Sequence, residues 1–287
     1  MSTFSALGIR KEYIQSIKEL GISTPSEIQE KTIPILLQSE TDFIGLAQTG
    51  TGKTAAFGLP VLHHIDTNEG NIQALILSPT RELVQQIKKQ LFKFTKYNEE
   101  KIFIEAVFGG EKIDRQIGNL KRTTHIVVAT PGRLIDLIER GSIDISHVKT
   151  VILDEADEML SMGFKQDLNR ILKFTTESNR KTWLFSATMP EEIKKIIKTY
   201  MDANAPRVEI NRNSLVNANI RHQFVKTTIK DKPADIISYL LKREASRGII
   251  FCRTKAGAQN LAAHLIEEGF SAAALEGDMQ QKERDKV

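Results

Sequence analysis

Short apolar runs alternate with amphipathic stretches of helical length along most of this 287-residue chain. The runs are rich in Ile, Val and Leu, as strands buried on both faces of a sheet are. Repeated strand–helix–strand units place such strands in parallel order. We therefore predict an α/β fold in which helices cover both faces of a parallel sheet. The predicted strands are residues 43–47, 74–78, 102–108, 125–129, 148–153 and 182–186.

Turn and capping residues mark the ends of several predicted helices. The segment 24–27, Thr-Pro-Ser-Glu, matches a capping box in which Pro25 takes the first helical position. Pro131 likewise indicates the start of a helix, and Gly141 its end.

The periodic pattern lapses in the polar, Asn-rich segment around residues 211–219. We predict one domain at 1–209, a linker at 210–219 and a second, partial α/β domain at 220–287. In the second domain we expect strands at 220–227, 248–252 and 271–275, and helices at 234–243 and 256–267. The sequence ends within a predicted helix near residue 280, so we expect this domain to be incomplete.

Cysteine content and charge limit the class of protein. Cys252 is the only cysteine, which excludes a disulfide framework and a thiolate zinc cluster and favours the reducing cytoplasm. Residues 1–10 lack the apolar stretch of a signal peptide, and no apolar run is long enough to cross a bilayer. The net charge of +4 suits a polyanionic partner, although many basic proteins bind no nucleic acid.

A glycine-rich segment, Ala47 to Thr54, directly follows the first predicted strand and precedes a helical pattern. Its glycines allow backbone amides to face phosphate oxygens, Lys53 can reach the terminal phosphates, and Thr54 can bind Mg²⁺. The general phosphate-loop pattern has glycine in place of Ala47, and a glycine-rich turn without a ligand is the alternative interpretation. The residues expected to bind nucleotide are Thr49, Gly50, Thr51, Gly52, Lys53 and Thr54.

The predicted strand 148–153 ends in Asp154-Glu155-Ala156-Asp157. Parallel strands present their carboxyl ends at the ligand-binding edge of such a sheet. We predict that Asp154 holds Mg²⁺, that Glu155 orients and polarises the attacking water, and that Lys53, Asp154 and Glu155 are catalytic. An acidic cluster alone is more typical of a solvated helix start, but its combination with Lys53 indicates nucleotide hydrolysis.

The chain resembles the DEAD-box family of ATP-dependent RNA helicases, whose name spells residues 154–157. Further family segments occur in the family's order, and Ala47 is the residue that this family carries in its phosphate loop. The resemblance implies two RecA-like domains, the second partial, with ATP and Mg²⁺ as cofactors and short RNA duplexes as substrates. The segments are 21–29, 79–83, 109–110, 130–133, 186–188, 250–254 and 281–284.

The resemblance also implies roles for residues outside the phosphate loop. Gln29 would read the adenine edge, and Phe4 would stack on the adenine ring. Asp157, Ser186 and Thr188 would couple the nucleotide state to domain closure. Without the other motifs, we would interpret Gln29 as a residue of a helix-capping turn and Phe4 as a core residue. The tripeptide Ser-Ala-Thr is too common to indicate a function by itself.

A third set of family positions would contact the RNA backbone. Hydroxyls, backbone amides and arginines suit phosphates, so we expect binding to be independent of sequence and sensitive to salt. Helix capping and solvation explain the individual residues equally well, and the preference for RNA comes only from the family resemblance. The positions are Thr80, Arg81, Gly110, Thr130, Gly132, Arg133, Thr254, Gln281 and Arg284.

Two later motifs of the family's second domain are absent from this sequence, including arginines that touch the γ-phosphate. Because an arginine finger contributes roughly 10³ to 10⁵ to the rate in other systems, we expect weak ATP binding and almost no turnover by this chain. Two other functions remain open: an ATPase acting on DNA or on protein partners, and a nucleotide-gated RNA clamp without useful unwinding.

Overall fold

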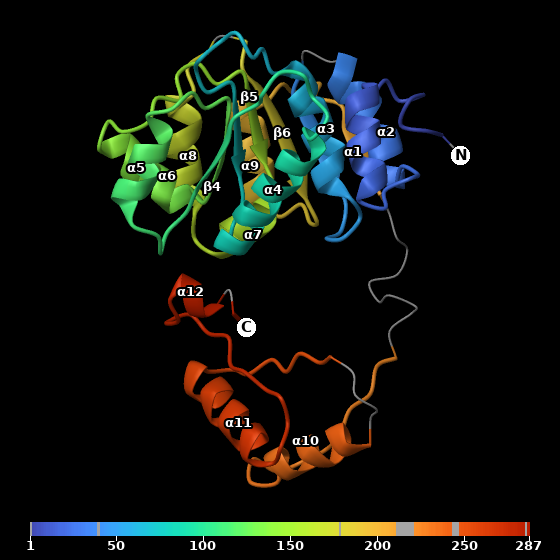
Figure 1. Ribbon diagram of the computed structural model, residues 1–287, viewed down its shortest axis with the longest axis vertical. Coiled ribbons are helices and arrows are strands. Elements are labelled where there is room, and N and C mark those ends of the chain that lie inside the picture. The colour runs from blue at the N-terminus through green and yellow to red at the C-terminus, as the bar shows by residue number, and fades with distance from the viewer. Residues whose placement is uncertain (1, 39–40, 178, 211–220, 243–246, 285) are drawn as a thin grey trace. The chain divides into compact units, whose positions relative to one another are not determined.

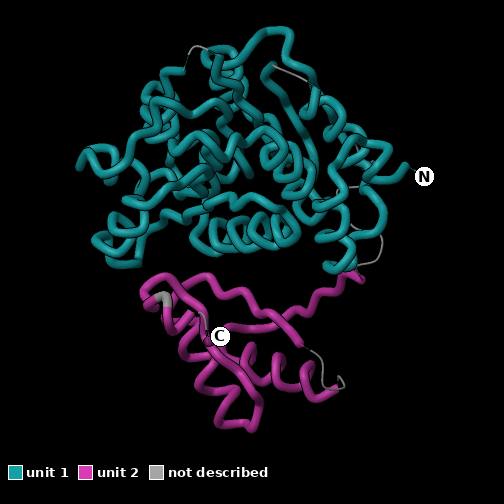
Figure 2. The backbone as a smooth tube through the Cα atoms, turned by 45° about the horizontal axis from the view of Figure 1, so that its top comes forward, with its two compact units in different colours: residues 1–212 teal, residues 213–287 magenta. Residues whose placement is uncertain are grey.

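The computed structural model describes residues 2–38, 41–177, 179–210, 221–242, 247–284 and 286–287 (Figure 1). The chain divides into two compact units, residues 1–212 and 213–287 (Figure 2). Of the linker predicted at 210–219, all but residue 210 lies outside the described residues.

Unit 1 is built on a seven-stranded sheet of order β3-β4-β2-β5-β6-β1-β7, in which all pairs are parallel. The six strands predicted for this part of the chain are confirmed. The strands are β1 Phe43–Leu46, β2 Ala74–Leu77, β3 Ile104–Val107, β4 Ile126–Ala129, β5 Thr150–Leu153, β6 Lys181–Ser186 and β7 Arg207–Glu209.

Two hydrophobic clusters, one on each face, hold helices against this sheet. Helices α1 to α4 pack on one face and α5 to α9 on the other. In β2, Ala74 and Ile76 belong to the first cluster and Leu75 and Leu77 to the second, so both faces need apolar residues. The helices are α1 Lys11–Glu19, α2 Glu27–Gln38, α3 Lys53–His64, α4 Arg81–Phe94, α5 Ile113–Leu120, α6 Pro131–Glu139, α7 Ala156–Ser161, α8 Lys165–Phe174 and α9 Glu191–Tyr200.

The capping box at the start of α2 lies two residues later than predicted. The helix begins at Glu27, and the backbone N–H of Ser26 donates to Oε1 of Gln29 at 2.9 Å. Pro25 therefore precedes the helix, and the side-chain half of the capping box joins Ser26 and Gln29 instead of residues 24 and 27. The prediction for α6 is confirmed, since Pro131 is its first residue and Gly141 follows its last turn with a φ of 61°.

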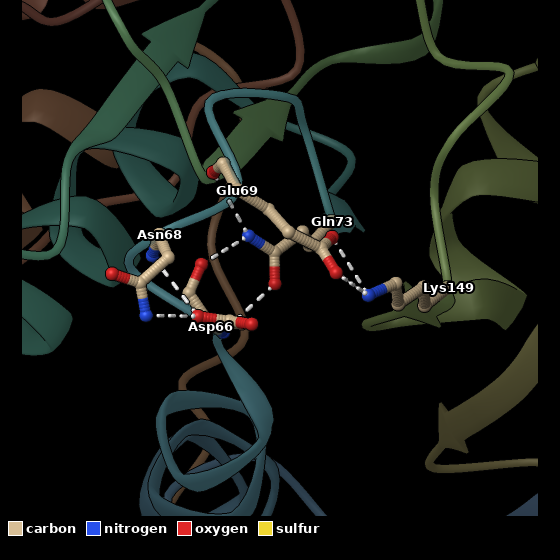
Figure 3. Close-up of polar contacts among 5 residues, drawn as sticks. All are labelled: Asp66, Asn68, Glu69, Gln73 and Lys149. Carbon is tan, nitrogen blue, oxygen red and sulfur yellow. Dashed lines mark hydrogen bonds and ion pairs between the residues drawn. The ribbon is translucent and has the colours of Figure 1, made fainter.

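The loop between α3 and β2 is held by polar contacts at the amino ends of the strands (Figure 3). The buried side chain of Gln73 accepts from the backbone N–H of Asp66 at 2.9 Å and donates to the Asp66 carbonyl at 2.7 Å. Glu69 in the same loop binds Nζ of Lys149, just before β5, at 2.7 Å. These contacts fix the loop at the amino ends of the strands, and the carboxyl ends carry the predicted site.

Unit 2 contains α10 Lys232–Leu241, α11 Lys255–Glu267 and the short α12 Gln281–Arg284. The two longer helices confirm the prediction. The strands predicted at 220–227, 248–252 and 271–275 are wrong for the residues that the structure describes, which form no strand there. A strand requires ladder hydrogen bonds to a neighbour, and Ile249 and Phe251 are instead 83% and 92% exposed.

No helix among the described residues of either unit is both long and apolar enough to cross a membrane.

The aromatic cluster around Phe185 yields a stability prediction for unit 1. Phe185 is fully buried between Phe43 and Phe57, with ring centroids 5.6 and 5.3 Å away. We expect Phe185→Ala to lower the free energy of unfolding by about 3 to 5 kcal/mol, because a cavity replaces the ring. Urea titration followed by the fluorescence of Trp183, the only tryptophan, measures this unit directly.

Phe92→Ala is the matched control, because Phe92 is 67% exposed and its removal opens no cavity. We expect it to change the free energy of unfolding by no more than about 0.5 kcal/mol. Equal losses for the two variants would contradict the assignment of Phe185 to the core.

Candidate functional site

The predicted site residues of unit 1 that follow α2 in the chain lie together at the carboxyl ends of the strands, because each of them comes after a strand of a parallel sheet. The phosphate loop follows β1, the acidic motif follows β5 and Ser186 ends β6; these three strands are neighbours in the sheet. The predicted RNA positions follow β2, β3 and β4, which form the adjoining half. The sheet order therefore separates the predicted nucleotide-binding residues from the predicted RNA-binding residues, and we call the two groups the nucleotide half and the nucleic-acid half.

The phosphate loop depends on two glycines with left-handed backbone conformation. Gly50 has a φ of 78° and Gly52 a φ of 96°, a region that residues with a Cβ rarely adopt. Lys53 begins α3, is 6% exposed, and donates from Nζ to the carbonyl of Ala47 at 3.1 Å. Thr54 follows in the first turn of α3. The loop is thus folded around a buried ammonium group at a helix N-terminus, the arrangement that receives phosphate.

The segment before α2 holds this loop from the side. Ser26 Oγ donates to the Thr51 carbonyl at 2.7 Å, and Nε2 of Gln29 donates to the Gly52 carbonyl at 3.0 Å. A Cβ on Gly52 would lie 2.5 Å from that Nε2, so Gln29 also requires glycine there. Phe4 is 3% exposed within the hydrophobic cluster of the first face. The roles of Gln29 and Phe4 toward adenine stay predictions.

Asp154 brings a carboxylate into the same region from the end of β5. It is 5% exposed, and its Oδ1 is buried without a hydrogen-bond partner in the described part of the chain. Burial raises the pKa of Asp154 to about 7, while the charge of Lys53 acts in the opposite direction. An unpartnered buried carboxylate oxygen fits a Mg²⁺ ligand, since this ion prefers oxygen donors.

Mg²⁺ also suits the small number of protein donors available at this edge. Across the described residues, no group of three His, Cys, Asp or Glu side chains could hold a metal. Mg²⁺ is commonly bound through one or two protein oxygens together with substrate phosphates. Asp154 and Thr54 match that requirement.

Glu155 carries an unusual backbone conformation at the start of α7. Its φ of 51° is the only positive φ of a residue other than glycine in the described parts of the chain. Burial raises the pKa of its carboxyl, and Lys53 opposes that shift. Such strained residues cost about 1 to 3 kcal/mol and cluster at functional sites. The residue predicted to orient water is thus the one whose backbone departs from an ordinary helix start.

Asp157 joins the acidic motif to the segment that follows β6. Its carboxylate accepts from the N–H and the hydroxyl of Thr188 at 2.9 and 2.7 Å, and from the N–H of Ala187 at 3.4 Å. Burial raises the pKa of Asp157, but the hydrogen bonds from Thr188 and Ala187 outweigh it, so the pKa lies below its usual value, and Ser186 Oγ donates to the Thr188 carbonyl at 2.7 Å. The structure thus brings together the three residues predicted to couple nucleotide state to closure.

The nucleic-acid half is organised around Gly110, whose φ is 90°. A Cβ at this position would lie 2.1 Å from Nη1 of Arg81, so the guanidinium of Arg81 rests against the glycine. Thr80 caps α4 by accepting from the N–H of Leu83 at 3.3 Å, and Thr130, before α6, is 7% exposed. Arg81 and Gly110 therefore lie together as predicted positions, and Thr80 performs the capping role that the sequence also allowed.

Arg133 reveals two residues that the sequence analysis missed. Its Nη1 donates to the carbonyl of Glu111 and to Oε1 of Gln116, both at 3.1 Å. Gln116 is 2% exposed and donates to the carbonyl of Phe108 at 2.9 Å. These contacts fix the loop after β3 to α6, where Gly132 lies beside Arg133. A single glutamine on a helix gives no sequence signal for such a role.

In unit 2, two of the predicted RNA positions, Thr254 and Arg284, make local contacts. Thr254 caps α11 by accepting from the N–H of Gly257 at 3.0 Å. Nη1 of Arg284 donates to the carbonyl of Glu276 at 2.9 Å, and Gln281 is the first residue of α12. Their contacts to RNA stay predictions.

Comparison with known proteins places these features in a family. A family model described as DEAD/DEAH box helicase matches residues 26–196, and a model described as helicase conserved C-terminal domain matches residues 231–287. The ATP-dependent RNA helicase CshA of Limosilactobacillus reuteri is 43% identical over 285 residues, which cover 99% of this chain and 56% of the relative. The DEAD-box ATP-dependent RNA helicase CshA of Geobacillus kaustophilus is 41% identical, with 100% and 60% covered. The chain spans little more than half the length of these relatives.

Solved structures agree with the sequence matches. A DEAD box protein from the hyperthermophile Methanococcus jannaschii is 38% identical with a TM-score of 0.68, covering 99% of this chain and 75% of that chain. A variant of S. cerevisiae Dbp5 bound to RNA and ADP BeF3 is 30% identical with a TM-score of 0.87, covering 100% and 72%. Since the first family model covers more than half of the sequence, and the loops at the sheet edge carry its motifs, the chain belongs to the DEAD/DEAH box helicase family.

Proposed function

We propose that this chain provides the ATP–Mg²⁺ site, at the carboxyl ends of the unit 1 strands, of an ATP-dependent RNA helicase of the DEAD-box type. One observation carries the proposal: the buried ammonium of Lys53 and the buried, unpartnered carboxylate oxygen of Asp154 converge from the loops after β1 and β5. Two charges removed from water add little to the stability of the fold. They suit a ligand that contains phosphate and a metal ion, since Lys53 can pair with the phosphate and Asp154 with the metal.

Each residue of the nucleotide half has a chemical task in this proposal. The amides of residues 49–52 and the N-terminus of α3 receive the phosphates, and Lys53 neutralises their charge. Thr54 and Asp154 would hold Mg²⁺, which supplies further charge neutralisation at the transferred phosphoryl group. Glu155 orients the attacking water and accepts its proton. Gln29 and Phe4 would select adenine.

RNA binding and coupling follow from the adjoining loops. The hydrogen bonds of Asp157 to Thr188 tie the acidic motif to the chain leaving β6, and we propose that they transmit the nucleotide state. The RNA backbone would be held by hydroxyls, amides and arginines of both units, without reading bases. These positions are Thr80, Arg81, Gly110, Thr130, Gly132 and Arg133 in unit 1 and Thr254, Gln281 and Arg284 in unit 2.

RNA is favoured over DNA because the relatives are named RNA helicases and because the Dbp5 variant was solved with bound RNA. We also propose a RecA-like domain at 1–209 and a partial RecA-like domain at 220–287, with cytoplasmic action in keeping with the exposed free thiol of Cys252. An RNA clamp without unwinding and a DNA-dependent ATPase are the competing functions. ATP-dependent binding to RNA without strand separation would support the first, and equal binding to DNA of the same sequence the second.

Replacing Lys53 tests the nucleotide half. We expect Lys53→Ala to weaken binding of a fluorescent ATP analogue by about 10- to 100-fold, because a hydrogen bond to a charged group contributes about 1.5 to 3 kcal/mol. The control is Lys173→Ala, an exposed lysine of α8, which should leave the dissociation constant unchanged. Unaltered affinity in Lys53→Ala would refute the proposed phosphate site.

Gly110→Ala tests the nucleic-acid half. The added Cβ would displace the guanidinium of Arg81 and strain the backbone at a φ of 90°, so we expect single-stranded RNA to bind about tenfold more weakly with ATP binding unchanged. Gly118→Ala in α5 is the control, because nothing lies within 4 Å of its Cβ. Filter-binding titrations at fixed salt measure the dissociation constant of RNA for each variant. Equal RNA affinity of Gly110→Ala and Gly118→Ala would contradict the prediction that the RNA backbone contacts Gly110 and Arg81.

Glu155→Gly tests whether the strained backbone serves function at the expense of stability. Glycine adopts a φ of 51° without strain, so we expect this variant to be about 0.5 to 1 kcal/mol more stable than Glu155→Ala, which loses the same carboxylate but keeps the strain. Urea unfolding compares the two. An order reversed in favour of alanine would show that the left-handed conformation is absent in solution.

A further inference from the structure

The first strand in the sheet order, β3, has an open side. The carbonyls of Phe103 and Val107 accept from N–H groups of Ile126 and Thr130, which belong to β4 and its end. Because successive residues of a strand direct their backbone groups to opposite sides, Ile104 and Ala106 direct their N–H and C=O groups away from β4. No other described strand pairs with β3 on that side.

A groove of about 380 Å³ follows this open side. Its walls come from α4 and α5, which pack on opposite faces of the sheet, and Ala106 forms part of its floor. Phe92 of α4 lines the groove and is 67% exposed, so its ring is accessible to a side chain that enters the groove. We call this feature the β3 edge groove.

Charges in the β3 edge groove are largely neutralised within it. Lys88 pairs with Glu105 at 2.9 Å, and Arg115 pairs with Glu111 at 3.2 Å. Lys89 also lines the groove, is exposed, and has no ion-pair or hydrogen-bond partner among the described residues. One free cation offers little to a polyphosphate chain, whose binding depends on several cations that displace counterions.

We propose that the β3 edge groove binds an extended peptide segment of a partner protein, which carries one carboxylate and adds a strand beside β3. Free backbone donors and acceptors at a sheet edge are matched by another backbone, and alternate side chains of the added strand supply specificity. A carboxylate of the peptide pairs with Lys89, and an apolar side chain packs on Phe92. The proposal does not depend on ATP or RNA binding.

Three variants separate the parts of this interaction. Ala106→Pro removes an outward N–H that the sheet ladder does not use, as proline on an edge strand allows. Lys89→Glu reverses the free charge in the groove. Lys93→Glu makes the same change four residues further along α4, at an exposed position that does not line the groove.

The test uses the complete 287-residue chain and two fluorescein-labelled peptides of alternating valine and threonine, one with a central glutamate and one with a central lysine. Fluorescence anisotropy should show that the parent chain binds the glutamate peptide more tightly than the lysine peptide. We expect Lys89→Glu to weaken binding of the glutamate peptide about tenfold and to bind the lysine peptide more tightly instead, because the charge in the groove is reversed. Lys93→Glu should leave the affinity for both peptides unchanged. Ala106→Pro should abolish binding of either peptide. Amide exchange at residues 104 and 106 should slow when the glutamate peptide binds.

Failure of both peptides to bind at about 1 mM would overturn the proposal, as would equal losses in Lys89→Glu and Lys93→Glu. Loss of single-stranded RNA binding in Lys89→Glu, with peptide binding absent, would assign the groove to nucleic acid instead. If Ala106→Pro melts at a lower temperature than the parent chain, its loss of binding is not informative. The comparison of Lys89→Glu with Lys93→Glu and the amide exchange at residues 104 and 106 then decide whether the peptide binds beside β3.

Discussion

Two opposite charges buried at the same sheet edge, the ammonium of Lys53 and the carboxylate of Asp154, impose the main constraint on this structure. Removing a charge from water is expensive, and burial alone would favour the neutral acid, as the raised pKa of Asp154 shows. The charge of Lys53 offsets part of that cost. The loops after β1 and β5 must therefore keep a fixed position relative to each other. Strands β1 and β5 both pair with β6, so the sheet supports both loops rigidly.

The surrounding contacts extend this support outward from the charge pair. Ser26 and Gln29 hold the carbonyls of Thr51 and Gly52, and Asp157 holds the backbone of Thr188. Each contact joins a motif to a segment distant in sequence. A displacement of one loop must therefore break hydrogen bonds in another, which makes the edge a coupled unit rather than a set of independent side chains.

Sequence patterns predicted the parts of this arrangement that local chemistry determines. Buried strands leave apolar runs, and phosphate binding demands glycines before Lys53, so both were visible without coordinates. Strand β7 was missed because only Val208 is buried between exposed Arg207 and Glu209. The bonds of Arg133 to Glu111 and Gln116 were missed because they join separate elements. Segment 248–252 is apolar, yet an apolar run cannot show whether a neighbouring strand pairs with it.

Several residues assigned to ligands already have protein partners, and this affects what binding requires. Both ends of the Gln29 amide are hydrogen-bonded, and Arg133 donates to a carbonyl and an amide oxygen. A nucleotide or RNA strand that uses these groups must replace existing bonds, so the net gain is only the difference between two hydrogen-bonded states. In return, the side chains are ordered before the ligand arrives, which reduces the entropy lost on binding. The same hydrogen bonds that stabilise the folded edge therefore set its affinity for ligands.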